Sequence, residues 1–260
     1  MNVKEINNTT VAVWFSCGAA SAVAAKRTVD LYNKNYYVRV LNNPVQEEDE
    51  DNRRFLKDVE EWIGVEIEEV RSKKYPNQSC KEVWDSRRYM SGISGAPCTL
   101  ELKKRARQDW ERNNDVNFHV LGFTSDEEKR HQRFIRNEPL MKVIPILIRE
   151  GITKADCYKI LMQAGIDLPR VYKMGYPNAN CIGCVKASSP TYWNHVRKMH
   201  PEVFKDRAKQ SREIGAKLVK HKGERLYLDE LDPEAKGRPL KNMDFECGLF
   251  CDSGGRGDND

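Results

Sequence analysis

The sequence has no hydrophobic run of the length that a membrane-spanning helix requires. No stretch approaches the ~18 consecutive apolar residues of such a helix. The opening residues, MNVKEINNTT, also lack the apolar segment of a secretory signal. Charged residues make up 32% of the chain, which indicates a well-solvated surface. We therefore expect a cytoplasmic protein with no membrane partner.

A strong excess of one charge is also missing. Lys and Arg total 44 and Asp and Glu total 39, which gives a formal net charge of +5. This modest excess favours anionic partners such as nucleotides, sulfate or RNA, but the basic residues are spread along the chain. The densest basic region, from about Lys205 to KHKGERLYL, is typical of a solvated helix face, and a nucleic-acid partner stays an alternative.

Cysteine is too infrequent for a disulfide scaffold. The 260 residues contain eight cysteines at uneven spacing, namely Cys17, Cys80, Cys98, Cys157, Cys181, Cys184, Cys247 and Cys251. In a reducing compartment, a C-x-x-C pair with further cysteines is typical of metal or redox chemistry. Cys157 lies within the helical pattern KADCYKIL and is expected to be a packed core thiol.

Strands and helices alternate along the first part of the chain. VAVWFS predicts a strand over residues 11–16, followed by a small-residue turn and a helix over about 22–33. Strands are predicted at 36–43 and 65–70, and the spacing of Phe55, Val59, Trp62 and Ile63 predicts a helix between them that ends at Gly64. This order predicts an α/β fold, a Rossmann-like three-layer sandwich with a mostly parallel sheet.

The remaining pattern is less regular. A loop-rich region over residues 73–98 precedes a helix at 99–113 and a strand at 117–123. A further helix is predicted between Thr153 as its N-cap and Gly165 as its stop. A cysteine loop and a helical stretch over about 191–219 complete the pattern, with a polar tail after it.

The turn after the first strand is built from small residues. Ser16, Cys17, Gly18, Ala19 and Ser21 leave room for phosphate oxygens to approach the backbone at a helix N-terminus. Such turns are common in α/β proteins, so a purely structural turn explains this segment equally well. No Gly-Lys-Ser/Thr sequence ends the turn, which excludes a Walker A motif.

Several motifs of the sequence, taken in their order along the chain, resemble those of the PP-loop superfamily. Within that superfamily they resemble the phosphoadenylyl-sulfate (PAPS) reductase family. FSCGAAS resembles the PP-loop, APCTLELK the family's Cys-Thr-x-x-x-Lys segment and GFTSDEEKRHQRF its glycine-acidic-arginine loop. LNNPVQEEDEDNRRFLKDVEEWIGVEI, CIGC and ECGLF complete the series. The resemblance implies an adenine nucleotide alpha hydrolase-like fold that binds an adenine nucleotide as substrate or ligand. It also implies a nucleotide-binding domain over residues 1–190 and a helical extension with a cysteine-bearing tail over 191–260.

The PP-loop segment departs from the family pattern at three positions. Cys17 replaces the first glycine, and Ala19 and Ala20 stand where ATP-pyrophosphatase members have Lys and Asp. The missing Asp counts against magnesium-dependent cleavage of ATP, so the segment is closer to the reductase branch.

The cysteine motifs imply a metal centre. A thiolate pair such as Cys181 and Cys184 can hold iron or zinc, because the turn between them points both sulfurs the same way. In iron–sulfur members of the family, a tandem cysteine pair and a C-x-x-C hold a 4Fe-4S cluster beside the nucleotide. Here a proline precedes Cys98, so one ligand is missing, and Cys251 or Cys80 is the candidate replacement. The resemblance thus implies a 4Fe-4S cluster on Cys98, Cys181, Cys184 and Cys251, with zinc or no metal as alternatives.

ECGLF resembles the tail motif of sulfate-nucleotide reductases. In them the cysteine attacks the sulfur of the bound substrate, and a thiol reductant such as thioredoxin then clears it. The resemblance assigns this nucleophilic role to Cys247, with Phe250 in place of the family's histidine. The alternative is that Cys247 and Cys251 are metal ligands that fasten the tail to the cluster.

Two basic residues are candidate phosphate ligands. Lys103 lies four residues beyond Thr99 and therefore on the same helix face. Arg130 aligns with the family's phosphate-binding arginine, whose planar fork suits phosphate oxygens. Glu127 is either the orienting partner of Arg130 or a solvated acid, and His131 is expected to be a surface histidine.

Three functions follow from these patterns. The leading hypothesis is an oxidoreductase or sulfurtransferase of the PAPS reductase family with an iron–sulfur centre. The second is an ATP pyrophosphatase-type thiolation enzyme that acts on RNA or DNA. The third is a nucleotide-sensing or nucleic-acid-binding module that has lost the chemistry. A homo-oligomer is compatible with each of them.

Overall fold

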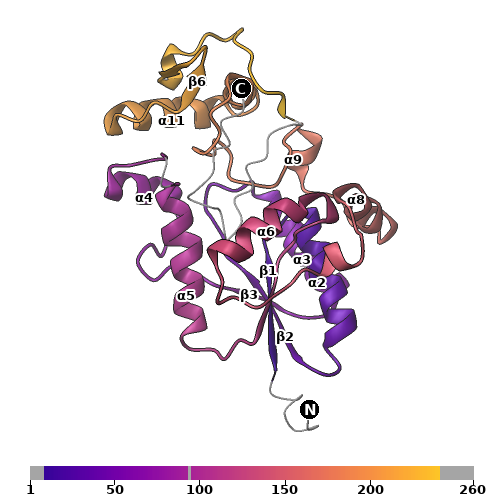
Figure 1. Ribbon diagram of the computed structural model, residues 1–260. Coiled ribbons are helices and arrows are strands. Elements are labelled where there is room, and N and C mark those ends of the chain that lie inside the picture. The colour runs from indigo at the N-terminus through magenta and orange to yellow at the C-terminus, as the bar shows by residue number, and fades with distance from the viewer. Residues whose placement is uncertain (1–8, 93–94, 241–260) are drawn as a thin grey trace. The chain divides into compact units, whose positions relative to one another are not determined.

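The computed structural model describes residues 9–92 and 95–240 and divides the chain into two compact units (Figure 1). The first unit contains Met1–Pro44, Glu50–Val70 and Ala106–Arg170, and the second contains Val45–Asp49, Arg71–Arg105 and Val171–Asp260. These units are interleaved along the sequence, whereas the sequence-based division drew one boundary after residue 190.

The first unit is built on a five-stranded, all-parallel sheet. Its strands are β1 (Thr10–Phe15), β2 (Tyr37–Asn42), β3 (Ile67–Glu69), β4 (Phe118–Val120) and β5 (Val143–Ile144), in the order β3-β2-β1-β4-β5. Helices flank the sheet, so the predicted α/β class is confirmed and the architecture is consistent with a Rossmann-like three-layer sandwich. The chain builds outward from β1 in one direction and from β4 in the other, which makes the β1/β4 boundary the topological switch point.

The helices of this unit follow their apolar spacing. On α3 (Asp51–Ile63), Phe55, Val59 and Ile63 are buried, and the helix ends at Gly64 in a left-handed conformation, as predicted. The other helices are α2 (Ala19–Tyr32), α5 (Arg105–Glu111), α6 (Glu128–Asn137), α7 (Ile146–Arg149) and α8 (Lys154–Gln163). The Thr153 side chain caps α8, which confirms the predicted N-cap.

The second unit is mainly helical. It contains α4 (Cys80–Arg87), the π-helix η1 (Thr99–Lys104), α9 (Arg170–Lys173), α10 (Pro190–Met199), α11 (Pro201–Ile214), the antiparallel strands β6 (Val219–His221) and β7 (Glu224–Leu226), and the short helix η3 (Leu228–Glu230). Two predictions are corrected here. The region predicted as loop contains α4, and the predicted helical stretch over 191–219 is two helices that break at His200, because Pro201 cannot continue the hydrogen bonding of α10.

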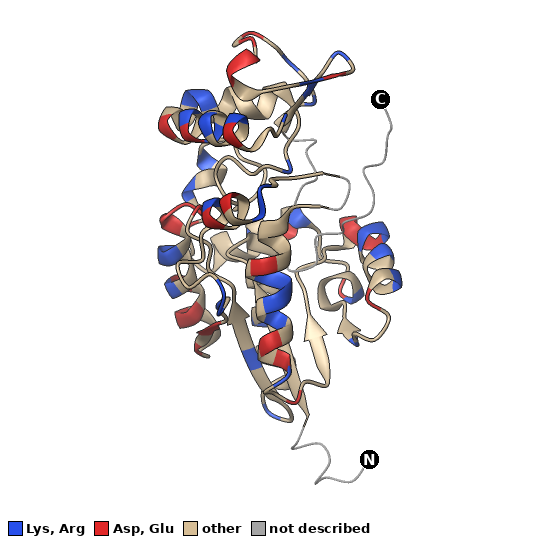
Figure 2. Cartoon of the chain, turned by 90° about the vertical axis from the view of Figure 1, so that its left-hand side faces the viewer, with Lys and Arg blue, Asp and Glu red and all other residues tan. Residues whose placement is uncertain are grey.

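Charges of both signs are mixed along the helices. Figure 2 shows Lys and Arg interspersed with Asp and Glu on the exposed helices, as the spread of basic residues in the sequence predicts. Within the ranges that the structure describes, no helix is both long and apolar enough to cross a membrane.

Candidate nucleotide loop and metal centre

Hydrogen bonds between small residues hold the loop after β1. The Ser16 backbone N–H donates to Ser21 Oγ at 3.1 Å, and the Ser21 hydroxyl donates to the Gly18 carbonyl oxygen at 2.9 Å. Cys17 keeps a φ of 55°, the left-handed conformation that a glycine would favour. Cys17, which stands at the position of the first glycine in the PP-loop pattern, therefore has a glycine-like backbone.

Helix α2 begins at Ala19, three residues earlier than predicted, with Gly18 as its N-cap, so Ala19 and Ser21 lie in its first turn. Gly18 is extended, and no side-chain hydrogen bond caps the helix. The first N–H groups of a helix have no partner within the helix, and its dipole places partial positive charge at the same end. The loop and the first turn of α2 thus form an arrangement that suits an anion.

Two neighbouring strands fix this loop. Asn42, at the end of β2, donates from Nδ2 to the Phe15 carbonyl oxygen at 2.9 Å and to Cys17 Sγ at 3.6 Å. Gly122 follows β4, and a Cβ atom on it would lie 2.8 Å from the backbone nitrogen of Ser21. Only glycine permits this close approach. The loop therefore lies at the switch point, where open α/β sheets bind ligands beyond the carboxyl ends of their strands.

Arg130 lies on α6 in the same unit. Its guanidinium forms an ion pair with Glu127 and lies over the Phe123 ring, 5.3 Å from the centroid. Glu127 also completes a capping box with Thr124. Glu127 is therefore the orienting partner of Arg130. The prediction for His131 is wrong, because its side chain is buried against Phe123 and burial lowers its pKa.

Lys103 belongs to the second unit. It lies on the π-helix η1, where its ammonium group is buried and lies 3.5 Å from Oε1 of the half-buried Glu48. A buried lysine requires such a counter-charge. Its predicted role as a phosphate ligand stays a prediction.

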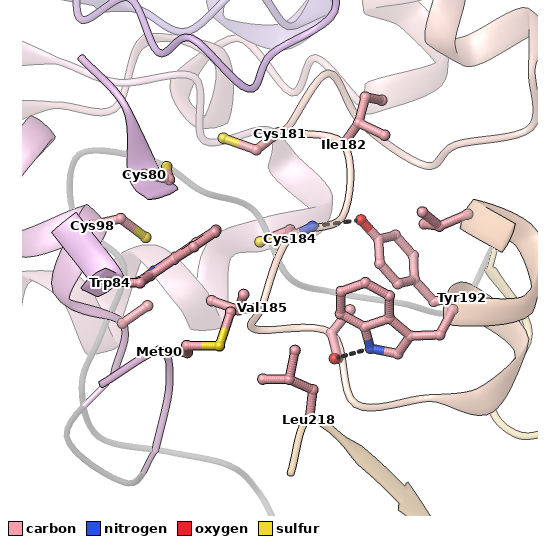
Figure 3. Close-up of a cluster of buried hydrophobic side chains, with 14 of the residues drawn as sticks. Cys80, Trp84, Met90, Cys98, Cys181, Ile182, Cys184, Val185, Tyr192 and Leu218 are labelled. Carbon is pink, nitrogen blue, oxygen red and sulfur yellow. Dashed lines mark hydrogen bonds between the residues drawn. The ribbon is translucent and has the colours of Figure 1, made fainter. Parts of the chain in front are cut away.

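Four cysteines from three segments gather in the core of the second unit. Cys80 is the first residue of α4, Cys98 is the N-cap of η1, and Cys181 and Cys184 come from the loop before α10. All four are buried, none of them forms a disulfide, and they belong to one apolar cluster with Trp84. Figure 3 shows their sulfur atoms around a common space.

The thiols influence one another's ionisation. Hydrogen bonds to Cys181 and Cys98, together with burial, raise the pKa of Cys80 well above its usual value. The hydrogen bond from Cys80 lowers the pKa of Cys98 to about 7 against the opposing effect of burial, and the positive charge of Lys186 adds to this lowering. The site therefore favours a thiolate at Cys98, and thiolates are the form that binds metal.

Glu47 joins the segments that carry the cysteines. Its carboxylate accepts hydrogen bonds from the Ser79 hydroxyl at 2.8 Å, the Cys80 N–H at 2.8 Å and the Lys81 N–H at 3.0 Å, at the start of α4. Its backbone carbonyl accepts from the N–H of Ile182, between the paired cysteines, at 2.9 Å. One residue thus fixes both the Cys80 helix and the C-x-x-C loop.

The remaining polar contacts show whether a metal group fits this site. The Tyr192 hydroxyl accepts a hydrogen bond from the Cys184 N–H at 2.9 Å. Among the described residues, the buried Trp84 indole N–H has no partner at normal hydrogen-bond geometry, yet it lies close enough to Cys98 to help lower the pKa of that thiol. Across the described residues, no three His, Cys, Asp or Glu side chains have the geometry of a site for a single metal ion. A set of four sulfur ligands with an orphaned donor beside it fits an iron–sulfur cluster, whose ligands are spread over several irons.

The other cysteines have different positions. Cys157 is fully buried in the first unit, where burial raises its pKa to about 12, in keeping with a packed core thiol. Cys247 and Cys251 lie outside the described residues. Sequence analysis considered Cys80 only as an alternative ligand and missed Glu47 and Trp84. For Trp84, the available signal was its four-residue spacing from Cys80, which places both side chains on the same face of one helix.

In comparisons with known proteins, no family model and no curated protein matches this chain.

Proposed function

We propose that this chain is a cytoplasmic enzyme of the PAPS reductase type, which binds an adenine nucleotide and performs redox or sulfur-transfer chemistry with an iron–sulfur centre. The observation that carries the proposal is the gathering of four buried cysteines from three segments. Four thiols buried together are difficult to explain by packing alone, and thiolates are the usual ligands of iron–sulfur clusters. The sequence resemblance supports the same assignment.

The nucleotide is assigned to the loop of the first unit. The uncapped start of α2, the small side chains of Ser16, Gly18 and Ser21 and the close approach of Gly122 support binding of phosphate oxygens by backbone N–H groups. Arg130, oriented by Glu127, adds a guanidinium that would neutralise phosphate charge.

The metal centre is assigned to Cys80, Cys98, Cys181 and Cys184. This set replaces Cys251 by Cys80 as the fourth ligand, because Cys80 shares hydrogen bonds with Cys98 and Cys181. An iron–sulfur cluster bound there would supply electron-transfer or sulfur-transfer chemistry. The protein residues hold the thiolates, exclude water from them and fix the segments that carry them.

A metal analysis tests this assignment. Anaerobically purified protein should be brown and contain iron, about four atoms per chain for a four-iron cluster. Alanine at any of the four cysteines should lower the iron content. Cys157→Ala is the matched control, because it removes a buried thiol in the first unit and should keep the iron. Stoichiometric zinc in colourless protein would refute the iron–sulfur assignment, and loss of iron in Cys251→Ala but not in Cys80→Ala would reassign the fourth ligand.

A turnover assay tests the reaction. The anaerobic protein is incubated with adenylyl sulfate, phosphoadenylyl sulfate and ATP in turn, each with a dithiol reductant. In the proposed reaction the Cys247 thiolate attacks the substrate sulfur, releases the nucleotide and keeps the sulfonate as a thiosulfonate. The dithiol then displaces sulfite and is itself oxidised to a disulfide. Cys247→Ser should stop turnover while nucleotide binding and iron persist.

The same assay distinguishes the rival functions. Consumption of ATP alone, to AMP and pyrophosphate in the presence of RNA or DNA, would identify a thiolation enzyme. Binding without turnover of any of the three nucleotides would identify a sensing module.

A further inference from the structure

Helix α11 buries an arginine that forms no ion pair with a carboxylate among the residues that the structure describes. The Arg207 side chain is only 4% exposed, and its Nη1 donates to the neutral amide oxygen of Gln210 at 2.7 Å. Its Nε has no hydrogen-bond partner within the described part of the chain. Among the described residues, no carboxylate lies within ion-pair distance of Arg207. Arg107, equally buried in the first unit, is by contrast paired with Glu111 at 2.8 Å.

This arrangement calls for an anion. A guanidinium cannot shed its proton in a protein, and a buried charge without a counter-charge is strongly unfavourable. A structure that retains such a group therefore offers it a negative partner.

The four-cysteine site lies next to the Arg207 guanidinium. That group stacks on the Trp84 ring at 4.2 Å from the centroid, and Trp84 is on the same helix as Cys80. Its unpartnered Nε lies 3.7 Å from the position that a Cβ on Gly183 would take, and Gly183 is between Cys181 and Cys184. Arg207 therefore contacts both the helix and the loop that carry cysteines.

We propose that Arg207 is the charge-balancing residue of the metal centre and stabilises the negative charge of its thiolate ligands. This inference rests on the metal centre proposed above. A cluster with four thiolate ligands gains one further negative charge when it is reduced. A buried positive charge beside it favours the reduced state, so Arg207 raises the reduction potential.

The test compares wild-type protein with three variants. Arg207→Gln removes the charge, Arg207→Lys keeps it without the planar stacking, and Lys209→Gln removes a charge from the exposed side of the same helix. Lys209 is the matched control because its side chain is 79% exposed. Circular dichroism checks the fold of each variant. Where Arg207→Gln does not fold, Arg207→Met replaces it, because its aliphatic stem still covers Trp84.

The measurements are the reduction potential, from anaerobic titration followed by visible absorbance, and the rate of metal loss to a chelator. Arg207→Gln should favour the oxidised cluster tenfold, a potential ~59 mV lower for one electron, and should lose metal faster. Arg207→Lys should recover most of the wild-type potential, and Lys209→Gln should match wild type. A folded Arg207→Gln with unchanged potential and metal loss would overturn the inference. So would an Arg207→Lys variant as impaired as Arg207→Gln, because stacking rather than charge would then be the cause.

The metal content of the wild-type protein separates this inference from the proposed function. Zinc in place of iron would refute the iron–sulfur assignment, and faster zinc loss from Arg207→Gln than from Lys209→Gln would still support the charge-balancing role. Equal zinc loss from the two variants would overturn it, as would wild-type protein without any metal.

Discussion

Gly122→Ala is the sharpest test of the loop at the switch point. A Cβ on Gly122 would lie 2.8 Å from the Ser21 nitrogen, 2.9 Å from its Cα and 3.0 Å from the Ala20 carbonyl carbon. All three are backbone atoms, so no flexible side chain can move aside. The end of β4 and the first turn of α2 must separate, and overpacking of this kind costs about 1–3 kcal/mol. The melting temperature should fall by about 2–4 °C for each kcal/mol.

The same separation displaces the N–H groups assigned to the nucleotide phosphates. We expect the Kd for ATP or adenylyl sulfate, measured by calorimetry, to rise at least ~tenfold, which corresponds to about 1.4 kcal/mol. Gly64→Ala is the control. Gly64 has a φ of 70° and open space around it, so alanine there costs about 1–2 kcal/mol through backbone strain alone. Gly64 ends α3 just before the amino end of β3. It therefore lies at the amino ends of the strands, whereas the loop follows the carboxyl end of β1.

The two variants should therefore lose similar stability, but only Gly122→Ala should lose nucleotide affinity. Equal affinity in Gly122→Ala and Gly64→Ala would place the nucleotide elsewhere. An unchanged melting temperature in Gly122→Ala would show that the close contact with Ser21 is not rigid.

Two further predictions concern stability. His119 is buried and accepts a hydrogen bond from the Trp14 indole at 3.1 Å, and burial lowers its pKa from 6.5 to about 4. As pH falls below 6.5, only the unfolded chain binds a proton at His119. The free energy of unfolding should therefore fall by about 2 kcal/mol between pH 7 and pH 5 because of His119. In urea unfolding, His119→Gln should show a correspondingly flatter pH dependence. Glu47→Ala should lower the free energy of unfolding by about 1–3 kcal/mol, because the start of α4 loses its acceptor, whereas Glu47→Gln keeps one acceptor oxygen and should lose less.

The parallel sheet could be predicted because its signals are local. Apolar strands alternate with a helix whose spacing of Phe55, Val59 and Ile63 is regular, and Gly64 marks the end of that helix. Helix α4 was missed although Ser79 and Glu82 form the S-x-x-E pattern of a helix start, because only a short, weakly apolar segment follows. Pro201 likewise signalled the break between α10 and α11.

The four-cysteine site could be predicted only in part. The spacing of Cys181 and Cys184 is a local signal for paired thiolates. That Cys80 joins them depends on where the fold places α4, and no local pattern encodes this. The burial of Arg207 is equally a property of tertiary packing, since the charged residues Lys205, Asp206 and Lys209 around it give the sequence context of a solvated helix.

The position of Cys80 bears on the role of the tail. Sequence alone left two alternatives for the tail. Either Cys247 is the nucleophile and Cys251 is the fourth metal ligand, or both cysteines are metal ligands. If Cys80 completes a set of four thiolates with Cys98 and the C-x-x-C pair, a four-iron cluster needs no ligand from the tail. The tail thiols are then available for attack on the substrate. We therefore expect Cys247→Ala and Cys251→Ala to retain full iron content, with turnover lost in Cys247→Ala. Loss of iron in either variant would make the tail a ligand and would leave the nucleophile to be sought elsewhere.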